Sequence, residues 1–156
     1  MLTTIVILPG CMTSEGEEED NFHGDSLDSK KVNDFNLITS DNQSYDFGQE
    51  TENKVVIIAF LFTNCYDICP IVTYNLGMIH DSLNQSIKDS IEFLTITVDP
   101  WRDNVTTLEE WKLATQSNWT HLTINDLDEQ SVEMKELMDV WNNFDVGLLI
   151  EDNVTD

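Results

Sequence analysis

The stretch Lys54-Val-Val-Ile-Ile-Ala-Phe-Leu-Phe62, which runs directly into Thr63-Asn-Cys65-Tyr-Asp-Ile-Cys69-Pro70, decides the fold of this 156-residue chain. Its first part is β-branched and aromatic without polar alternation, which predicts a strand buried on both faces of a parallel sheet. Pro70 predicts the first turn of a helix, where a proline costs no hydrogen bond. The two cysteines are therefore expected in the strand-to-helix turn and at the helix start, where the helix dipole lowers thiol pKa values.

Outward from this unit, hydrophobic periodicity predicts further strands and helices. A hairpin is expected over residues 35–47, and strands over 91–98 and 119–124. Helices are expected behind the cysteines, from Thr107 onward, and around residues 134–141. The residues expected to face the core from these helices are Val72, Leu76, Ile79, Leu83, Ile87, Leu108, Trp111, Ala114, Met134, Leu137, Met138 and Trp141. This order of elements predicts an open α/β sheet.

Right-handed crossovers place the carboxyl ends of parallel strands at one edge of such a sheet. Thr63 and Asp99 follow two different strands, so Cys65 and Asp99 are expected to be neighbours in one site. Three roles are open for a carboxylate such as Asp67 or Asp99 near the thiols. It can accept backbone N–H bonds in the turn, orient a group that binds a ligand, or assist proton transfer. Turn stabilisation is the preferred role for Asp67.

Arg102 is the one arginine of the chain and lies three residues after Asp99. Its position predicts an ion-paired loop beside the site. The alternative is a structural salt bridge from Arg102 to Asp103 or Glu109.

The spacing of the two thiols permits several chemistries. Residues i and i+4 of a helix share one face about 6 Å apart, which allows a disulfide or a two-sulfur site for a soft metal such as Cu(I). Alternatively, the cysteines are small buried hydrophobes. Zinc is disfavoured, because a structural zinc site needs four ligands and no second Cys or Cys/His pair with suitable spacing is present.

The motif Phe60-x-Phe62-Thr63-x-Cys65-x-Asp67-x-Cys69-Pro70 resembles the Sco/SenC family of thioredoxin-like copper proteins, although Tyr66 stands where the family usually has proline. A second motif, Thr97-Val98-Asp99-Pro100-Trp101-Arg102-Asp103, resembles the strand-end motif of that family. The resemblance implies a thioredoxin-like fold with an N-terminal β-hairpin. It also implies copper as the bound metal, with Cys65 and Cys69 as ligands and with Asp67 and Asp99 behind them.

The family resemblance implies an extracytoplasmic chaperone that delivers Cu(I) for cytochrome c oxidase assembly. Its partners are then the copper-bearing oxidase subunit or another copper acceptor, and a thiol reductant. The alternative is a thiol–disulfide oxidoreductase in which Cys65 and Cys69 form a redox pair that acts on cysteines of the copper acceptor or of another exported protein. Whether the chain is an enzyme stays open at this point.

A third metal ligand is not evident in the sequence. In the family a histidine far downstream completes a Cys-Cys-His copper site, and this chain ends at Asp156. His23 lies in an acidic tail, His80 lies roughly 16 Å along the helix from the second cysteine, and His121 lies in an expected strand. The expectation is a thioredoxin-like domain over residues 33–156 that lacks its C-terminal hairpin and helix. The absence of the family's downstream histidine favours the redox function over the metal function.

Composition and the N-terminus bear on partners and location. Thirty acidic residues against seven basic ones give a net charge of −23, which argues against binding nucleic acid and predicts repulsion of anionic membranes. Leu8-Pro9-Gly10-Cys11 resembles a lipobox, so residues 1–11 are expected to be a lipoprotein signal with the lipid at Cys11. Residues 12–32 are expected to form an acidic, disordered tether. Membrane contact is expected only through this N-terminal lipid or anchor.

Overall fold

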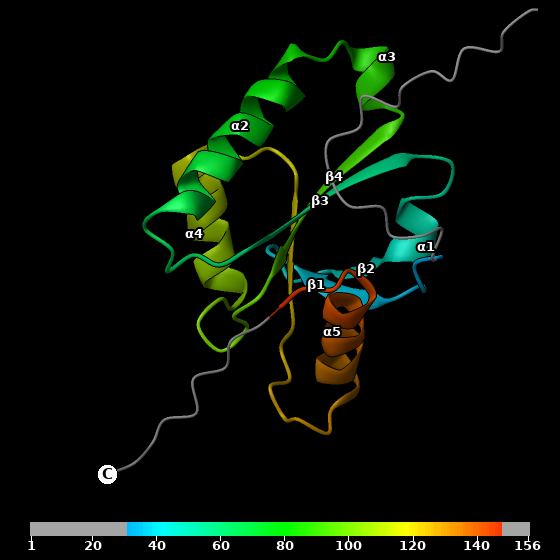
Figure 1. Ribbon diagram of the computed structural model, residues 1–156, viewed down its shortest axis with the longest axis vertical. Coiled ribbons are helices and arrows are strands. Elements are labelled where there is room, and N and C mark those ends of the chain that lie inside the picture. The colour runs from blue at the N-terminus through cyan, green and yellow to red at the C-terminus, as the bar shows by residue number, and fades with distance from the viewer. Residues whose placement is uncertain (1–30, 148–156) are drawn as a thin grey trace, which may run out of the picture.

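The computed structural model describes residues 31–147 and shows a mixed sheet with helices on both faces (Figure 1). The strands are β1 (Asn36–Thr39), β2 (Ser44–Asp46), β3 (Val55–Leu61), β4 (Ile91–Thr97) and β5 (Thr120–Thr123). The helices are α1 (Phe47–Glu50), α2 (Ile68–Ser82), α3 (Gln85–Lys88), α4 (Val105–Thr115) and α5 (Val132–Asn143). The predicted α/β class and N-terminal hairpin are confirmed. The expected signal over residues 1–11 and almost all of the expected tether over 12–32 lie outside the described residues.

The strands follow the order β2-β1-β5-β4-β3 across the sheet. β3 pairs in parallel with β4 and β4 with β5, whereas β1 is antiparallel to both β5 and β2. The register aligns Leu61 of β3 with Thr97 of β4, so both strands end at the same edge, as the crossover rule predicts. The segments that follow these two strands carry the cysteines and the residues 99–103 loop, and they begin at that shared edge.

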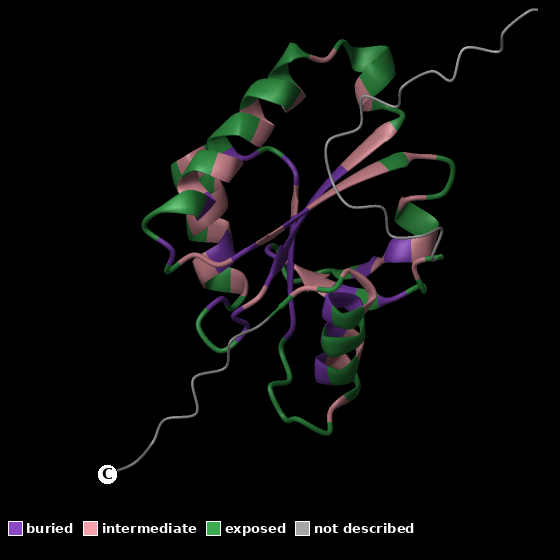
Figure 2. Ribbon diagram, in the orientation of Figure 1, coloured by how far each residue is buried: buried purple, intermediate pink, exposed green. Residues whose placement is uncertain are grey.

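Two apolar clusters pack on the sheet; α5 contributes to one, and α2 and α4 contribute to the other. In Figure 1, α2 and α4 lie together on one side of the strands and α5 lies on the other, and Figure 2 shows buried residues along the strands. Alternate residues of β3 serve the two clusters, because successive side chains of a strand point to opposite faces. The larger cluster is built around Phe35, Leu37, Tyr45, Phe47, Leu94, Ile96, Leu122, Ile124, Met134, Leu137, Val140 and Trp141. The smaller cluster is built around Ala59, Leu61, Cys65 and Cys69. The cysteines therefore belong to the α2 and α4 side of the sheet.

The prediction that the apolar strand is buried on both faces was wrong for much of β3. This strand lies at the edge of the described sheet, with β4 as its one strand neighbour among residues 31–147. Val55 is exposed, and only Ala59 and Leu61 are buried. The apolar run fits the two clusters that β3 contacts, one on each face of the sheet.

The helix behind the cysteines is shorter than its periodicity predicted. α2 ends at Ser82 because Leu83 adopts an extended conformation, with φ −75° and ψ 139°. The Asn84 side chain then accepts a hydrogen bond from the Ile87 N–H over 3.1 Å and begins α3. Ile79 and Ile87 are exposed rather than part of the core.

No helix within residues 31–147 has the length and apolar character needed to cross a bilayer.

The later helices also differ in detail from the predicted pattern. α4 begins at Val105 instead of Thr107, because the Asn104 side chain accepts from the Thr107 N–H over 3.0 Å. Ala114 and Met138, both expected in the core, are exposed. The buried stripes of α4 and α5 are thus narrower than the spacing of their apolar residues suggests.

Candidate functional site

Cys65 and Cys69 lie where the sequence predicted them, at the carboxyl edge of the sheet. Cys65 follows β3 in the turn, and its N–H donates to the Phe62 carbonyl over 3.3 Å. Cys69 is the second residue of α2. Both thiols are free, and the two residues are 9% and 4% exposed, respectively. The pair therefore combines burial with a position at a helix N-terminus.

Backbone N–H groups at the start of α2 surround the sulfur of Cys65. The Cys69 N–H donates to Cys65 Sγ over 3.3 Å, and the N–H groups of Asp67 and Ile68 and the Cys69 side chain also hydrogen bond to it. Burial raises the pKa of the Cys65 thiol, but these hydrogen bonds outweigh burial and hold the pKa below its usual value of 9.0. Cys65 is therefore the thiol that ionises more readily.

Cys69 has the opposite character. Burial raises the pKa of its thiol to about 11, and the hydrogen bond with Cys65 acts in the same direction. The negative charges of Cys65 and Asp103 raise it further, while a backbone hydrogen bond with Phe62 opposes them only in part. The site thus offers one readily formed thiolate beside one thiol that keeps its proton at neutral pH.

We expect iodoacetamide to label Cys65 at least about tenfold faster than Cys69 at pH 8. Because the pKa lies below 9.0 for Cys65 and at about 11 for Cys69, the two thiolate fractions differ by at least about a hundredfold. The lower nucleophilicity of the more acidic thiolate removes about one factor of ten. Peptide mass spectrometry after brief labelling of the reduced chain measures the ratio, and urea-unfolded chain is the control. Equal labelling in the folded chain would contradict the asymmetry.

Asp103 links the strand ends beside the cysteines, a role that the sequence did not reveal. The residue is fully buried. Its carboxylate accepts from the Thr63 N–H at 3.1 and 3.2 Å, from Thr63 Oγ1 at 2.5 Å and from Thr97 Oγ1 at 2.7 Å. Its carbonyl accepts from Thr123 Oγ1 at 2.6 Å. One residue therefore ties together segments at the ends of β3, β4 and β5, and the only sequence signal was a threonine at each of these ends.

The surroundings of Asp103 set its ionisation. Burial raises the pKa of its carboxyl group, and the charge of Asp99 adds to this effect. The hydrogen bonds from Thr63 and Thr97 stabilise the carboxylate and oppose the rise. Asp103 in turn raises the pKa of Cys69, so this carboxylate is electrostatically coupled to the thiol pair.

Asp67 does not stabilise the turn through its side chain, so that part of the prediction was wrong. It is the exposed N-cap residue of α2, with φ −117° and ψ −88°, and its side chain makes no capping hydrogen bond. This backbone conformation differs from the extended one that a capping aspartate normally adopts. Asp67 instead contributes its N–H to the Cys65 sulfur.

Asp99 forms the predicted ion-paired loop beside the strand ends. It is buried, and one of its carboxylate oxygens is paired with Nε of Arg102. The Asp99 N–H donates to Thr97 Oγ1 over 2.9 Å. Arg102 thus pairs with Asp99 and not with Asp103 or Glu109, which corrects the alternative. The charge of Asp99 also raises the pKa of Asp103.

The two histidines within the described residues lie away from the cysteines. The ring of His80, in the last turn of α2, packs against Phe93 and Trp119 with centroid distances of 5.3 and 6.0 Å. His121 is fully buried in β5. Over residues 31–147, no group of three or more His, Cys, Asp or Glu side chains is arranged to hold a metal ion. The soft donors that the described residues bring together are therefore two sulfurs.

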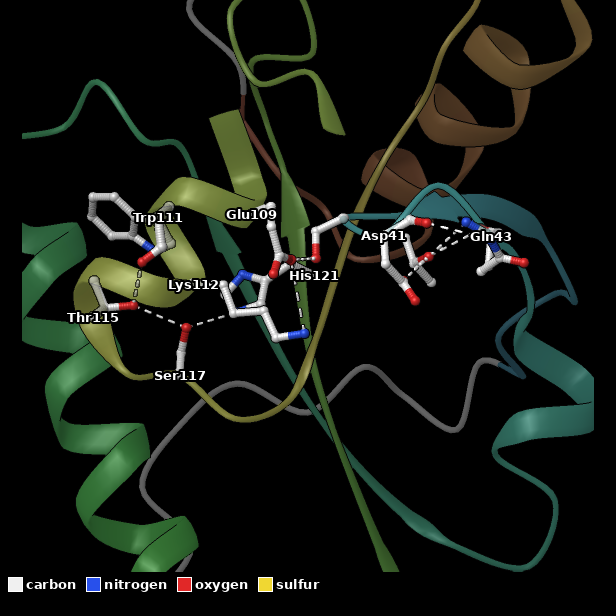
Figure 3. Close-up of polar contacts among 10 residues, drawn as sticks. Asp41, Gln43, Glu109, Trp111, Lys112, Thr115, Ser117 and His121 are labelled. Carbon is white, nitrogen blue, oxygen red and sulfur yellow. Dashed lines mark hydrogen bonds and ion pairs between the residues drawn. The ribbon is translucent and has the colours of Figure 1, made fainter. Parts of the chain in front are cut away.

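A chain of hydroxyl groups fixes the tautomer of His121 (Figure 3). Thr115 Oγ1 donates to the Trp111 carbonyl over 2.8 Å, so the 2.9 Å contact between Thr115 and Ser117 uses the only hydroxyl proton of Ser117. Ser117 Oγ must then accept from His121 Nε2 over 2.7 Å. The ring is neutral, and Nδ1 is a buried acceptor without a partner among the described residues.

Protonation of His121 should destabilise the fold as pH falls. Burial lowers its pKa from 6.5 to about 4, so between these values the unfolded chain binds the proton more readily than the folded chain. The contribution of His121 to the free energy of unfolding is therefore complete above pH 6.5. It falls by on the order of 3 kcal/mol as the pH falls toward 4. Urea unfolding from pH 4 to 7 measures the slope, and His121→Leu should flatten it. An identical slope in this variant would assign the pH dependence to other groups.

Comparison with known proteins identifies relatives of this chain. The sequence profile of the family described as SCO1/SenC matches residues 24–138. A SCO2-like protein from Rickettsia felis is 30% identical over 102 residues, which cover 65% of this chain and 49% of that protein. The chain thus spans about half the length of the curated relative that it matches.

Solved structures share the fold. Yeast Sco1 with copper bound matches with a TM-score of 0.64 and 25% identity, over 79% of this chain and 63% of that one. ScoI of Bradyrhizobium japonicum with copper bound matches with a TM-score of 0.62 and 18% identity, over 74% and 68%. These likenesses confirm the thioredoxin-like fold. Because the family profile also matches well over half of its residues, the chain belongs to the SCO1/SenC family.

Proposed function

We propose that this chain is an extracytoplasmic copper chaperone that binds Cu(I) through Cys65 and Cys69. It passes the ion to the copper-bearing subunit of cytochrome c oxidase or to another copper acceptor. Members of the family have been solved with copper bound, and another member, BsSco, is described as belonging to a family of cytochrome c oxidase assembly proteins. The observation that carries the proposal is the meeting of two free thiols at the start of α2, where the Cys69 N–H donates to Cys65 Sγ over 3.3 Å. Soft thiolate ligands favour Cu(I) over harder metal ions.

The ionisation of the two thiols describes how loading proceeds. Cys65, with its lowered pKa, supplies the first thiolate. Cys69, with its pKa raised to about 11, must lose its proton as the metal binds, so loading releases a proton and tightens as pH rises. The apolar cluster around both sulfurs limits the access of water to the bound ion. Transfer then requires that ligands of the acceptor replace these thiolates one at a time.

Anaerobic titration of the reduced chain with Cu(I), in competition with a chromogenic chelator, tests this proposal. We expect one Cu(I) per chain, and no binding after Cys65 and Cys69 have been oxidised to a disulfide. Displacement of protons during loading, recorded in weakly buffered solution, should accompany binding. A reduced chain that leaves all of the copper with the chelator would refute the copper proposal.

The ionisation asymmetry of the thiols supports a second candidate function, a thiol–disulfide oxidoreductase. In that reaction the Cys65 thiolate attacks a substrate disulfide, forming a mixed disulfide and releasing one substrate thiolate. Cys69, once deprotonated, attacks the Cys65 sulfur, so the substrate leaves with its second thiol and the chain becomes oxidised. A thiol reductant restores the dithiol. Reversible equilibration with glutathione redox buffers, in a chain that fails to bind Cu(I), would favour this function.

Membrane attachment through a lipid at Cys11 is part of the same proposal. Its support is the lipobox-like Leu8-Pro9-Gly10-Cys11 sequence; Cys11 lies outside the described residues. The Cys11→Ser chain should bind Cu(I) as the unchanged chain does, but should leave the membrane fraction of the expressing cells. Unaltered membrane association of this variant would contradict lipidation at Cys11.

A further inference from the structure

Beside the two cysteines, five large apolar side chains lie on the surface and form a stripe. Tyr66 is 89% exposed, Ile68 57%, Ile71 52%, Tyr74 66% and Met78 58%. We call these five residues the Tyr66–Met78 stripe. Single exposed apolar residues are common on proteins, whereas neighbouring ones mark interaction surfaces. From Ile68 to Met78 the stripe extends about 15 Å along α2.

The stripe is distinct from the face of α2 that packs on the domain. Cys69 and Thr73 are the buried residues of this helix. Val72 and Leu76 pack against the smaller apolar cluster, which contains both cysteines. Ile71, Tyr74 and Met78 follow one another at steps of three and four, which places them together on another face. Figure 2 shows much of α2 in the colour of exposed residues. α2 therefore has apolar side chains on two faces, and within the described residues only one of these faces packs against the rest of the domain.

The first two residues of the stripe are sequence neighbours of the two cysteines. Tyr66 directly follows Cys65, and Ile68 directly precedes Cys69. Because both cysteines are buried, a protein that exchanges copper or a disulfide with them must seat its own ligands closely over the start of α2. A partner in that position lies against the stripe. Tyrosine and methionine are also among the residues enriched at protein interfaces.

The charge around the stripe indicates the chemistry of the partner. Between Lys54 and Lys88 the chain carries Asp67 and Asp81 and no lysine or arginine. The whole chain has a net charge of −23, so a second copy and an anionic lipid surface are both repelled. A partner whose apolar patch is rimmed by lysine or arginine is attracted instead.

We infer that the Tyr66–Met78 stripe is the docking surface for the protein that exchanges copper or a disulfide with Cys65 and Cys69. The partner presents an apolar patch with a basic rim. This inference rests on the proposed function for the identity of the partner, but it concerns the contact surface and not the metal. The stripe supplies affinity and orientation, and the thiols supply the chemistry.

A binding measurement without copper tests the surface separately from metal binding. The probe is the soluble, copper-free, reduced copper-binding domain of the cytochrome c oxidase subunit from the same organism, titrated into the ¹⁵N-labelled reduced chain. We expect amide shifts concentrated in residues 65–79. The Ile71→Ser/Tyr74→Ser variant should bind at least about tenfold more weakly, because buried aromatic and aliphatic contacts dominate such interfaces. Higher salt should weaken the binding of the unchanged chain.

The matched control is the Leu127→Ser/Val132→Ser variant, which removes exposed apolar side chains just before and at the start of α5. It should bind the probe as the unchanged chain does. Circular dichroism melting and Cu(I) titration should be equal in all three chains, since all four side chains are exposed. Unchanged probe affinity in Ile71→Ser/Tyr74→Ser, or no binding of the probe by the unchanged chain, would overturn the inference. Failure of the Cu(I) titration alone would refute the copper proposal and leave the docking result standing.

Discussion

Serine in place of Cys65 or Cys69 should weaken Cu(I) binding by between about a hundredfold and ten-thousandfold. Two thiolates held at the start of one helix form a chelate, in which the second sulfur binds at a high effective concentration once the first is bound. Removing one sulfur loses this gain and not merely half of the affinity. Competition with a chromogenic Cu(I) chelator under anaerobic conditions measures the change.

The two variants should differ in the site that they leave behind. Cys69→Ser retains the Cys65 sulfur with the backbone N–H groups that stabilise its thiolate, whereas Cys65→Ser retains the thiol with the raised pKa. We therefore expect Cys65→Ser to bind more weakly at pH 7. Cys11→Ser makes the same chemical change elsewhere and should not alter affinity. Wild-type affinity in either site variant would contradict chelation by this pair.

Alanine in place of Asp103 should lower the free energy of unfolding by about 3 to 5 kcal/mol. The substitution removes the acceptor of the buried Thr97 Oγ1 and of two half-buried donors, the Thr63 N–H and Thr63 Oγ1. A buried donor left without an acceptor costs about 1 to 3 kcal/mol. Urea unfolding followed by tryptophan fluorescence measures the loss. Asp103→Asn keeps a carbonyl oxygen and should lose less.

An aspartate on the surface provides the matched control for this prediction. The Asp81 side chain is 76% exposed, so Asp81→Ala should change stability by less than about 0.5 kcal/mol. The Asp103→Ala chain, where folded, should also show altered relative labelling of Cys65 and Cys69, because Asp103 raises the pKa of Cys69. A loss of stability no larger than that of Asp81→Ala would show that the threonines find other acceptors.

Features with a local physical cause were predictable from the sequence. The apolar run before Thr63, the proline after Cys69 and the alternation around the first hairpin each act through neighbours in the chain, and the structure confirms β3, α2 and the β1–β2 pair. The shared strand edge also followed, because the crossover rule depends only on the order of elements. The position of the thiol pair therefore follows from the sequence.

Features that depend on distant contacts were not predictable. Asp103 is one acidic residue among thirty, and only the folded sheet brings Thr63 and Thr97 to its carboxylate. The choice of Asp99 as the partner of Arg102 depends on the conformation of one loop. Sequence patterns thus located the two thiols. They missed Asp103, whose hydrogen bonds hold the backbone that precedes Cys65.

The hydrogen bonds of Asp103 have a consequence for the entropy of ligand capture. Thr63 lies two residues before Cys65, and its N–H and hydroxyl are both held by Asp103. Asp103 is itself joined through its carbonyl to Thr123 of the strand β5. The backbone leading into the thiols is thus ordered when the chain folds, and little further conformational freedom is lost when a ligand arrives. The affinity of the pair for any ligand should then depend mainly on bond strength and proton release.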